Sequence, residues 1–200
     1  MEKYNTQKKI EQKIRNKPKG TVFVISDFSD LGSNDAIRKA LSRLVKEGKL
    51  KRELRGIYKK PNFNEFIKEE ITSSPKEIAY AHARAYGWEI VPSGNTALNE
   101  LGLSTQVPNV NTFISDGPSK TIEFNHKTTI KFKKITNREI SNVDYKSALL
   151  IEALKALKKE NITDDILDKI RKIYSEEELK KIKKDTKRSR SWIYEEILKL

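Results

Sequence analysis

The sequence predicts an α+β fold with a small N-terminal domain and a larger C-terminal domain. Helical and strand periodicities alternate in the N-terminal third, short apolar segments of strand length cluster between residues 90 and 135, and helical patterns fill residues 144–200. Pro61 closes the first group of elements. We therefore expect domains at residues 1–61 and 62–200, the second holding a small sheet followed by helices.

The N-terminal domain is predicted to contain a helix, a strand, two further helices and a two-stranded hairpin, in that order. Ser26 and Ser33 are suited to cap the two later helices, because a serine hydroxyl accepts a hydrogen bond from an unpaired amide at a helix start. This order is that of a winged helix-turn-helix. In such a domain the helix that follows the turn, here residues 34–47, enters the DNA major groove. The predicted bounds are a first helix ending at Pro18, a strand at 21–25, helices at 27–31 and 34–47, and hairpin strands at 49–54 and 57–60 around Arg55-Gly56.

Positive charge is concentrated near the start of the chain. The formal net charge is +13. Residues 1–60 contain 17 lysines and arginines and 7 acidic residues, whereas residues 61–135 contain 8 of each and residues 136–200 contain 16 and 13. A generally lysine-rich surface would spread the excess along the whole chain. The distribution therefore favours a localised basic patch and a polyanionic partner.

The predicted helix at residues 34–47 has one apolar face and one basic face. Ile37, Leu41 and Leu44 lie on the apolar face at helical spacing. A helix fits the major groove, where outward donors reach phosphates and base edges. We expect a phosphate at the helix N-terminus to meet Ser33 and Asn34, base edges to meet Arg38 and Ser42, and flanking phosphates to meet Lys39 and Arg43.

The predicted hairpin adds a second basic group to this domain. Its candidate DNA-binding residues are Lys51, Arg52, Arg55 and Lys59. These side chains are placed to meet a neighbouring phosphate backbone or the minor groove, and each phosphate that they neutralise steepens the salt dependence of binding. Double-stranded DNA is therefore the partner that the sequence predicts for this domain.

The C-terminal domain is predicted from shorter patterns. We expect residues 62–75 to form a connector, with Phe63, Phe66, Ile67 and Ile71 docking it against the rest of the chain. The predicted elements are a helix at 76–86, a turn at 91–94, a helix at 95–101 closed by Gly102, a hairpin of strands 112–115 and 121–124 around residues 116–119, a strand at 128–135, and helices at 144–159, 164–174, 176–184 and 189–200.

Two segments of the chain carry recognisable motifs. The first is AIRKALSRLVKEGKLKR at residues 36–52, with RGIY at 55–58, and the second is PSGNTALNELGLSTQVP at residues 92–108, with the strands at 112–115 and 121–124 after it. Together they resemble the AbiEi-type antitoxins of type IV toxin–antitoxin (abortive phage infection) systems. The resemblance covers about residues 5–140.

This resemblance implies two activities. One is transcriptional autorepression, in which the winged helix binds inverted repeats in the promoter of a two-gene operon. The other is antitoxin activity towards a nucleotidyltransferase toxin, with which direct contact is not required. The residues themselves point to DNA binding, whereas only the resemblance points to antitoxin activity.

Two alternatives to a DNA-binding regulator remain open at this stage. One is an RNA-binding module. The other is a basic adaptor that neutralises an acidic partner protein by direct contact. The residues of the C-terminal region that would meet such a partner are Lys158, Lys159, Lys180, Lys181, Lys183, Lys184, Lys187, Arg188 and Arg190.

Enzymatic activity is not expected. The chain has no cysteine, which excludes disulfides, thiolate metal sites and cysteine nucleophiles. Its two histidines, His82 and His126, are 44 residues apart and do not form a metal-binding motif. We expect no catalytic residue, no metal and no cofactor. The sequence shows neither a signal peptide nor a membrane span, so a cytoplasmic protein is expected.

Overall fold

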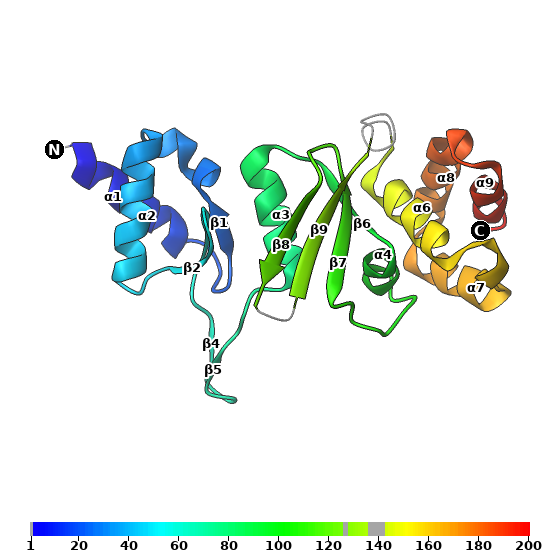
Figure 1. The fold of residues 1–200 in the computed structure, drawn as a ribbon, viewed down its shortest axis with the longest axis horizontal. Helices are drawn as coiled ribbons and strands as arrows, with labels where there is room; N and C mark the ends of the chain where they lie inside the picture. The colour runs from blue at the N-terminus through cyan, green and yellow to red at the C-terminus, as the bar shows by residue number, and fades with distance from the viewer. Residues whose placement is uncertain (1, 126–127, 136–142) are drawn as a thin grey trace. The chain divides into compact units, whose positions relative to one another are not determined.

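The computed structural model describes residues 2–125, 128–135 and 143–200. It is a mixed α/β protein whose C-terminal part is helical (Figure 1). Its contacts divide the chain into two compact units, residues 1–87 and residues 88–200. No helix among the described residues has both the length and the apolar character needed to cross a membrane.

The N-terminal unit contains the predicted series of elements and adds a small hairpin and a helix. The expectation that Phe63, Phe66, Ile67 and Ile71 dock residues 62–75 against the chain is wrong, because all four side chains are exposed on or beside this hairpin. Its three-stranded antiparallel sheet has the order β1-β3-β2, and β4 pairs with β5. The elements are α1 (Glu2–Arg15), β1 (Val22–Val24), the 3-10 helix η1 (Ile25–Leu31), α2 (Asn34–Lys46), β2 (Lys51–Leu54), β3 (Ile57–Lys59), β4 (Phe63–Asn64), β5 (Glu69–Glu70) and α3 (Pro75–Tyr86).

Apolar side chains at helical spacing build the core of this unit. Ile10 of α1 and Ile37 and Leu41 of α2 are completely buried, because α1 and α2 turn their apolar faces towards each other. Phe28 of η1 fills the space beside them, and its ring lies 5.6 Å from that of Phe23 on β1. The basic residues of α2 consequently remain on its outer face.

The start of η1 differs from the prediction of a helix capped by Ser26. The helix begins at Ile25, so Ser26 lies inside its first turn. The Asp27 carboxylate instead reaches back and accepts a hydrogen bond from the Val24 amide at 2.8 Å. A carboxylate within the first turn accepts a hydrogen bond from a free amide, and its negative charge interacts favourably with the positive end of the helix dipole.

The same aspartate explains why the first unit extends beyond Pro61, the boundary expected from the sequence. Arg84 of α3 forms a forked pair with Asp27, with Nε 2.8 Å from Oδ1 and Nη2 3.1 Å from Oδ2. Its Nη2 also donates to the Val22 carbonyl at 3.0 Å. These bonds hold α3 on β1 and η1, so residues 62–87 belong to the first unit.

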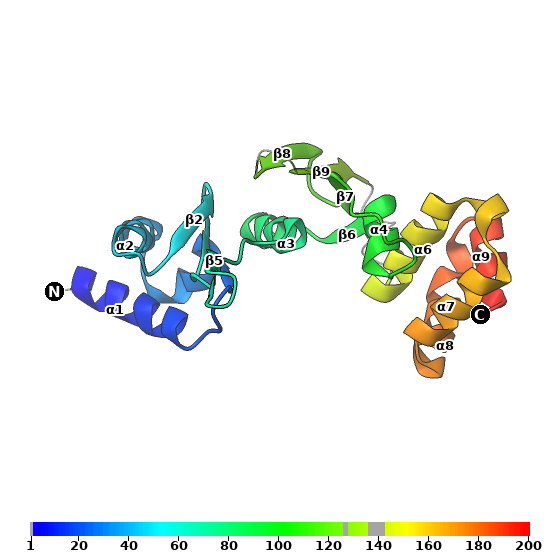
Figure 2. The same ribbon diagram turned by 90° about the horizontal axis from the view of Figure 1, so that it is seen from below.

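The C-terminal unit combines a four-stranded mixed sheet with helices. The sheet has the order β6-β7-β9-β8, in which β7 and β9 are parallel and the other pairs are antiparallel. Figure 2 shows α4 and α6 beside β6. The elements are β6 (Ile90–Ser93), α4 (Asn95–Glu100), β7 (Val110–Ser115), β8 (Lys120–Phe124), β9 (Thr128–Lys134), α6 (Tyr145–Leu157), α7 (Asp164–Ile173), α8 (Glu176–Asp185) and α9 (Ser191–Leu198), with 3-10 turns η2 (Lys159–Asn161) and η3 (Thr186–Arg188).

Two predictions for the sheet are wrong. Residues 91–94 were expected to form a turn, but Ile90–Ser93 is the buried strand β6, where Pro92 is tolerated because β6 is an edge strand. The strands β7 and β8 were expected to form a hairpin, but β9 lies between them. The strand β9 pairs antiparallel with β8 on one side and parallel with β7 on the other, where Phe132 of β9 lies opposite Phe113 of β7.

The predicted C-terminal helices are confirmed, and α6 is central to them. Leu150, Ala153 and Leu154 of α6 are completely buried against β6, α4, α8 and α9. A polar bond also joins α6 to the sheet, because the Ser93 hydroxyl donates to Glu152 Oε2 at 2.6 Å while Lys155 pairs with Oε1 at 2.8 Å. The nearly buried Glu152 carboxylate is therefore satisfied on both oxygens.

We expect Gly117→Ala to destabilise the C-terminal unit by about 1–3 kcal/mol, the usual range for overpacking. A Cβ at Gly117 would overlap the indole of Trp88, whose ring packs edge-on against Phe132 at 5.7 Å. Urea unfolding followed by Trp88 fluorescence in a Trp192→Phe background measures the loss.

The same substitution in a Trp88→Ala background is the control, followed by far-UV circular dichroism. Because the indole is absent there, the penalty of Gly117→Ala should largely disappear. An equal loss with and without the indole would show that the steric explanation is incorrect.

Candidate nucleic-acid interface

The outer face of α2 is polar and exposed. Arg38, Lys39 and Ser42 are all solvent-exposed, opposite the buried Ile37 and Leu41. Within the described part of the chain, the side chains of these three residues make no hydrogen bond or ion pair. Their donors are therefore available to a ligand without breaking an existing contact.

The start of α2 is fixed by the predicted cap. The Ser33 hydroxyl accepts a hydrogen bond from the Ala36 amide at 3.4 Å, and the helix begins at Asn34. Ser33 and Asn34 are both exposed. The next residue, Asp35, is also exposed and adds a negative charge to this end of the helix. An anion is therefore favoured by the helix dipole but disfavoured by Asp35.

Arg43 lies on the α1 side of the same helix and is partly engaged. Its Nη1 donates to Gln7 Oε1 at 3.3 Å, and the Gln7 amide donates in turn to Glu47 at 3.2 Å. Lys49 pairs with Glu47 at 2.9 Å, and its hydrogen bond is the main cause that lowers the pKa of the Glu47 carboxyl. Arg43 is exposed but less free than Arg38.

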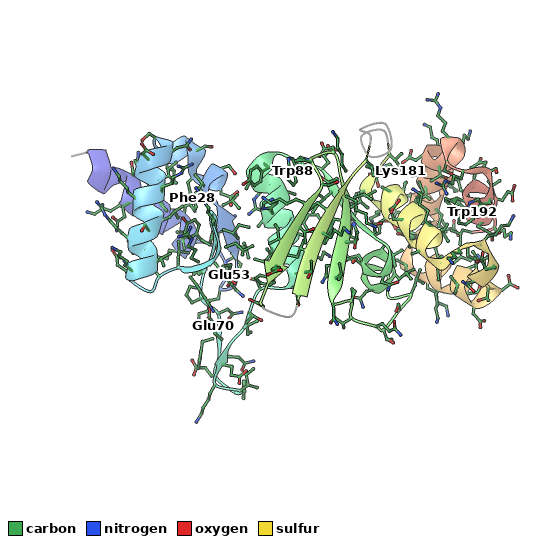
Figure 3. The ribbon with its side chains drawn as sticks, viewed as in Figure 1. Phe28, Glu53, Glu70, Trp88, Lys181 and Trp192 are labelled. Carbon is green, nitrogen blue, oxygen red and sulfur yellow. The ribbon has the colours of Figure 1, made fainter. Side chains whose placement is uncertain are left out.

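The β2–β3 hairpin carries the second predicted group. Lys51 and Arg52 are exposed on the edge strand β2, and Arg55 is exposed at a turn that Gly56 makes with a φ of 81°. Lys51 pairs at 2.9 Å with Glu70 of β5, which is labelled in Figure 3, and this contact raises the pKa of the Lys51 ammonium. Of the three cations, only Lys51 has a carboxylate partner among the described residues.

The prediction that Lys59 contacts DNA is wrong. Lys59 is only 1% exposed, and its Nζ donates to the Ile71 carbonyl at 2.5 Å. The reason lies in the topology, because β3 is the central strand of its sheet and all of its residues are buried. Lys59 thus links β3 to the chain segment that follows β5.

Two residues have roles that were not predicted. Lys60 donates to the carbonyls of Ile14, Arg15 and Lys17, at 3.1, 3.0 and 2.6 Å, and so satisfies the C-terminal end of α1. Lys46 is exposed one turn beyond Ser42 and extends the basic face of α2. Its helical spacing could have added Lys46 to the candidates, whereas nothing in the sequence pointed to Lys60.

Metal-binding residues do not gather in the described chain. No group of three or more His, Asp or Glu side chains with the geometry to hold a metal occurs among the described residues. His82 is nearly buried on α3, where its ring packs against Tyr86 at 4.7 Å. His126 lies outside the described residues.

A comparison with known proteins places this chain in a family. Residues 9–182 match a family described as a family of unknown function (DUF6088). The match spans both structural units, and the chain belongs to this family. No curated protein matches the chain.

We expect Lys60→Met to lower the free energy of unfolding by about 1–2 kcal/mol, because three charge-assisted hydrogen bonds at the end of α1 are lost. Urea denaturation followed by far-UV circular dichroism measures the change. Lys19→Met is the control, since Lys19 is exposed and its side chain makes no hydrogen bond or ion pair with a described residue. Equal losses in both variants would contradict the role assigned to Lys60.

Proposed function

We propose that the N-terminal unit is a winged helix-turn-helix that binds double-stranded DNA, and that the protein is a cytoplasmic transcriptional regulator. The observation that carries this proposal is the exposed face of α2, where Arg38, Lys39 and Ser42 have no partner within the described chain. A net charge of +13, most of it in the first 60 residues, supports a polyanionic ligand.

The geometry of α2 supports a major-groove contact. The helix is 13 residues long, is buried on one side only, and presents Arg38, Ser42 and Lys46 outwards. Arg38 and Ser42, one turn apart, take the base edges, where an arginine can bind guanine through two hydrogen bonds. Lys39 and Lys46 contact phosphates.

The hairpin supplies the wing. Arg52 and Arg55 project from an edge strand and a turn, so neither must leave a protein partner within the described chain to reach a phosphate. Lys51 differs, because a phosphate must compete with Glu70 for its ammonium. The wing therefore contributes two free cations and one that is already neutralised.

We further propose that this regulator is the autorepressor and antitoxin of a type IV toxin–antitoxin system. The support is the resemblance of residues 36–58 and 92–124 to the AbiEi-type antitoxins. It implies inverted repeats in the protein's own promoter as the DNA target and a nucleotidyltransferase toxin as the functional partner. Rescue of cells that express the product of the adjacent gene tests this second step, and failure to rescue contradicts it.

We expect Arg38→Ala with Arg43→Ala to weaken binding to the DNA upstream of the protein's own gene by at least tenfold, with an unchanged circular dichroism spectrum. Loss of one good base contact corresponds to about 1–3 kcal/mol. Fluorescence anisotropy with a labelled duplex measures the affinity. Lys17→Ala with Lys19→Ala removes the same charge from exposed positions of the same unit and is the control.

Retained binding in the Arg38/Arg43 variant would remove α2 from the interface. Tighter binding to structured RNA than to the duplex would favour the RNA-binding alternative. Co-purification with the adjacent gene product, in the absence of DNA binding, would favour the adaptor.

Arg55→Met and Lys59→Met should differ in the salt dependence of DNA binding. The slope of log K against log salt should fall by about 0.9 for Arg55→Met, the value for one phosphate contact in duplex DNA. It should be unchanged for Lys59→Met, because the Lys59 ammonium is buried on the Ile71 carbonyl. Titrations at several salt concentrations measure both slopes, and an equal fall would contradict the structural distinction.

A further inference from the structure

A cluster of exposed cations lies where α8 leads into α9. We call it the C-terminal basic surface, and its residues are Lys180, Lys184, Lys187, Arg188 and Arg190. Lys180 and Lys184 are one turn apart on the side of α8 opposite its buried residues Leu179 and Ile182. Lys187 and Arg188 belong to η3, and Arg190 directly precedes α9.

The backbone beneath these cations is held in place. Thr186 is 1% exposed, and its hydroxyl donates to the Ile182 carbonyl at 2.8 Å. The Ser189 amide donates to the Thr186 carbonyl, also at 2.8 Å. Ile193 and Ile197 then anchor α9 in the core with no exposed surface. The corner between the helices is therefore fixed, and its cations point away from the core.

The cations of the C-terminal basic surface have no partner among the described residues, unlike several other cations of this unit. None of the five makes an ion pair or a side-chain hydrogen bond within that part of the chain. Lys181, labelled in Figure 3, pairs instead with Asp144 at 2.7 Å. Other cations of this unit that pair with a carboxylate include Lys146 with Glu178, Lys155 with Glu152, Lys159 with Glu195, Arg171 with Asp168, and Lys199 with Glu196.

The nearby carboxylates do not neutralise this surface. Asp185 is half-buried and accepts a hydrogen bond from the Ser147 hydroxyl at 3.2 Å. Glu176 and Glu177 are exposed in the turn before Lys180 and weaken the positive field at that end of the surface. Residues 184–190 contain four cations and one carboxylate, Asp185, so a net positive charge remains there, and repulsion among these cations favours a ligand with several negative charges.

The composition of the surface indicates which polyanion it fits. The five residues of the C-terminal basic surface include no aromatic or large apolar side chain of the kind that anchors a helix in a membrane. Lysine is depleted from the cores of protein–protein interfaces. Lysine and arginine are, in contrast, the residues that usually contact nucleic-acid phosphates, and such contacts do not depend on the base sequence.

We propose that the C-terminal basic surface is a second contact for the phosphate backbone of duplex DNA, independent of sequence. This rests on the proposed DNA binding by the N-terminal unit but adds a separate site to it. Four of the five cations lie after residue 182, where the match to the family ends.

The test is the double variant Lys184→Gln with Arg188→Gln, compared with Lys169→Gln with Lys172→Gln. Both remove two exposed cations from the same unit. Binding of the full chain to a long duplex, once with the upstream sequence and once with unrelated sequence, is titrated between about 50 and 200 mM salt. For the Lys184/Arg188 variant, the slope of log K against log salt should fall in magnitude by about 1.8 on both duplexes, the value for two phosphate contacts. For the control variant it should fall by less than half of that.

The preference for the upstream over the unrelated duplex should be the same in the wild type and the Lys184/Arg188 variant, because backbone contacts carry no sequence information. An unchanged slope, or equal loss in the Lys169/Lys172 control, overturns the inference while leaving DNA binding by α2 intact. Absence of duplex binding by the wild type overturns both proposals. Loss of sequence preference in the Lys184/Arg188 variant would also overturn the backbone role.

Discussion

The N-terminal unit depends on the position of Asp27. Its carboxylate accepts hydrogen bonds from the Val24 amide and from two nitrogens of Arg84, and its carbonyl accepts one from the Lys13 ammonium at 2.7 Å. One residue thus joins α1, β1, η1 and α3. Because Phe28 follows it directly into the core, this network also fixes the support on which α2 rests. A charged network of this kind rigidifies a small unit when all of its members are satisfied.

Helical periodicity was sufficient to predict the candidate interface on α2. The spacing of Ile37, Leu41 and Leu44 defined the buried side, and Arg38 and Ser42 followed as exposed residues on the other. Lys59 could not be placed in the same way, because its burial depends on β3 being flanked by two strands and on the segment after β5 covering it. Sequence patterns report the face of an element but not the neighbours that later cover it.

The sheet of the C-terminal unit shows a similar limit. Its strands are short apolar segments that were largely recognised, but their order depends on pairing between residues distant in sequence. The insertion of β9 between β7 and β8 and the use of Pro92 in an edge strand both come from tertiary context. The helices from α6 onwards were predicted correctly, since the amphipathic spacing of α7 and α8 and the caps Asp144 of α6 and Ser175 of α8 are local signals.

The ion pair between Lys51 and Glu70 connects the wing to the short β4–β5 hairpin. If a phosphate takes over the Lys51 ammonium, the Glu70 carboxylate is released and the hairpin loses one of its ties to the sheet edge. By linkage this effect is reciprocal. A contact that holds Glu70 of the hairpin against Lys51 weakens phosphate binding by the wing by the same free energy as phosphate binding weakens that contact. A molecule that bound the exposed Phe66 at the hairpin tip would therefore change the affinity of Lys51 for a phosphate.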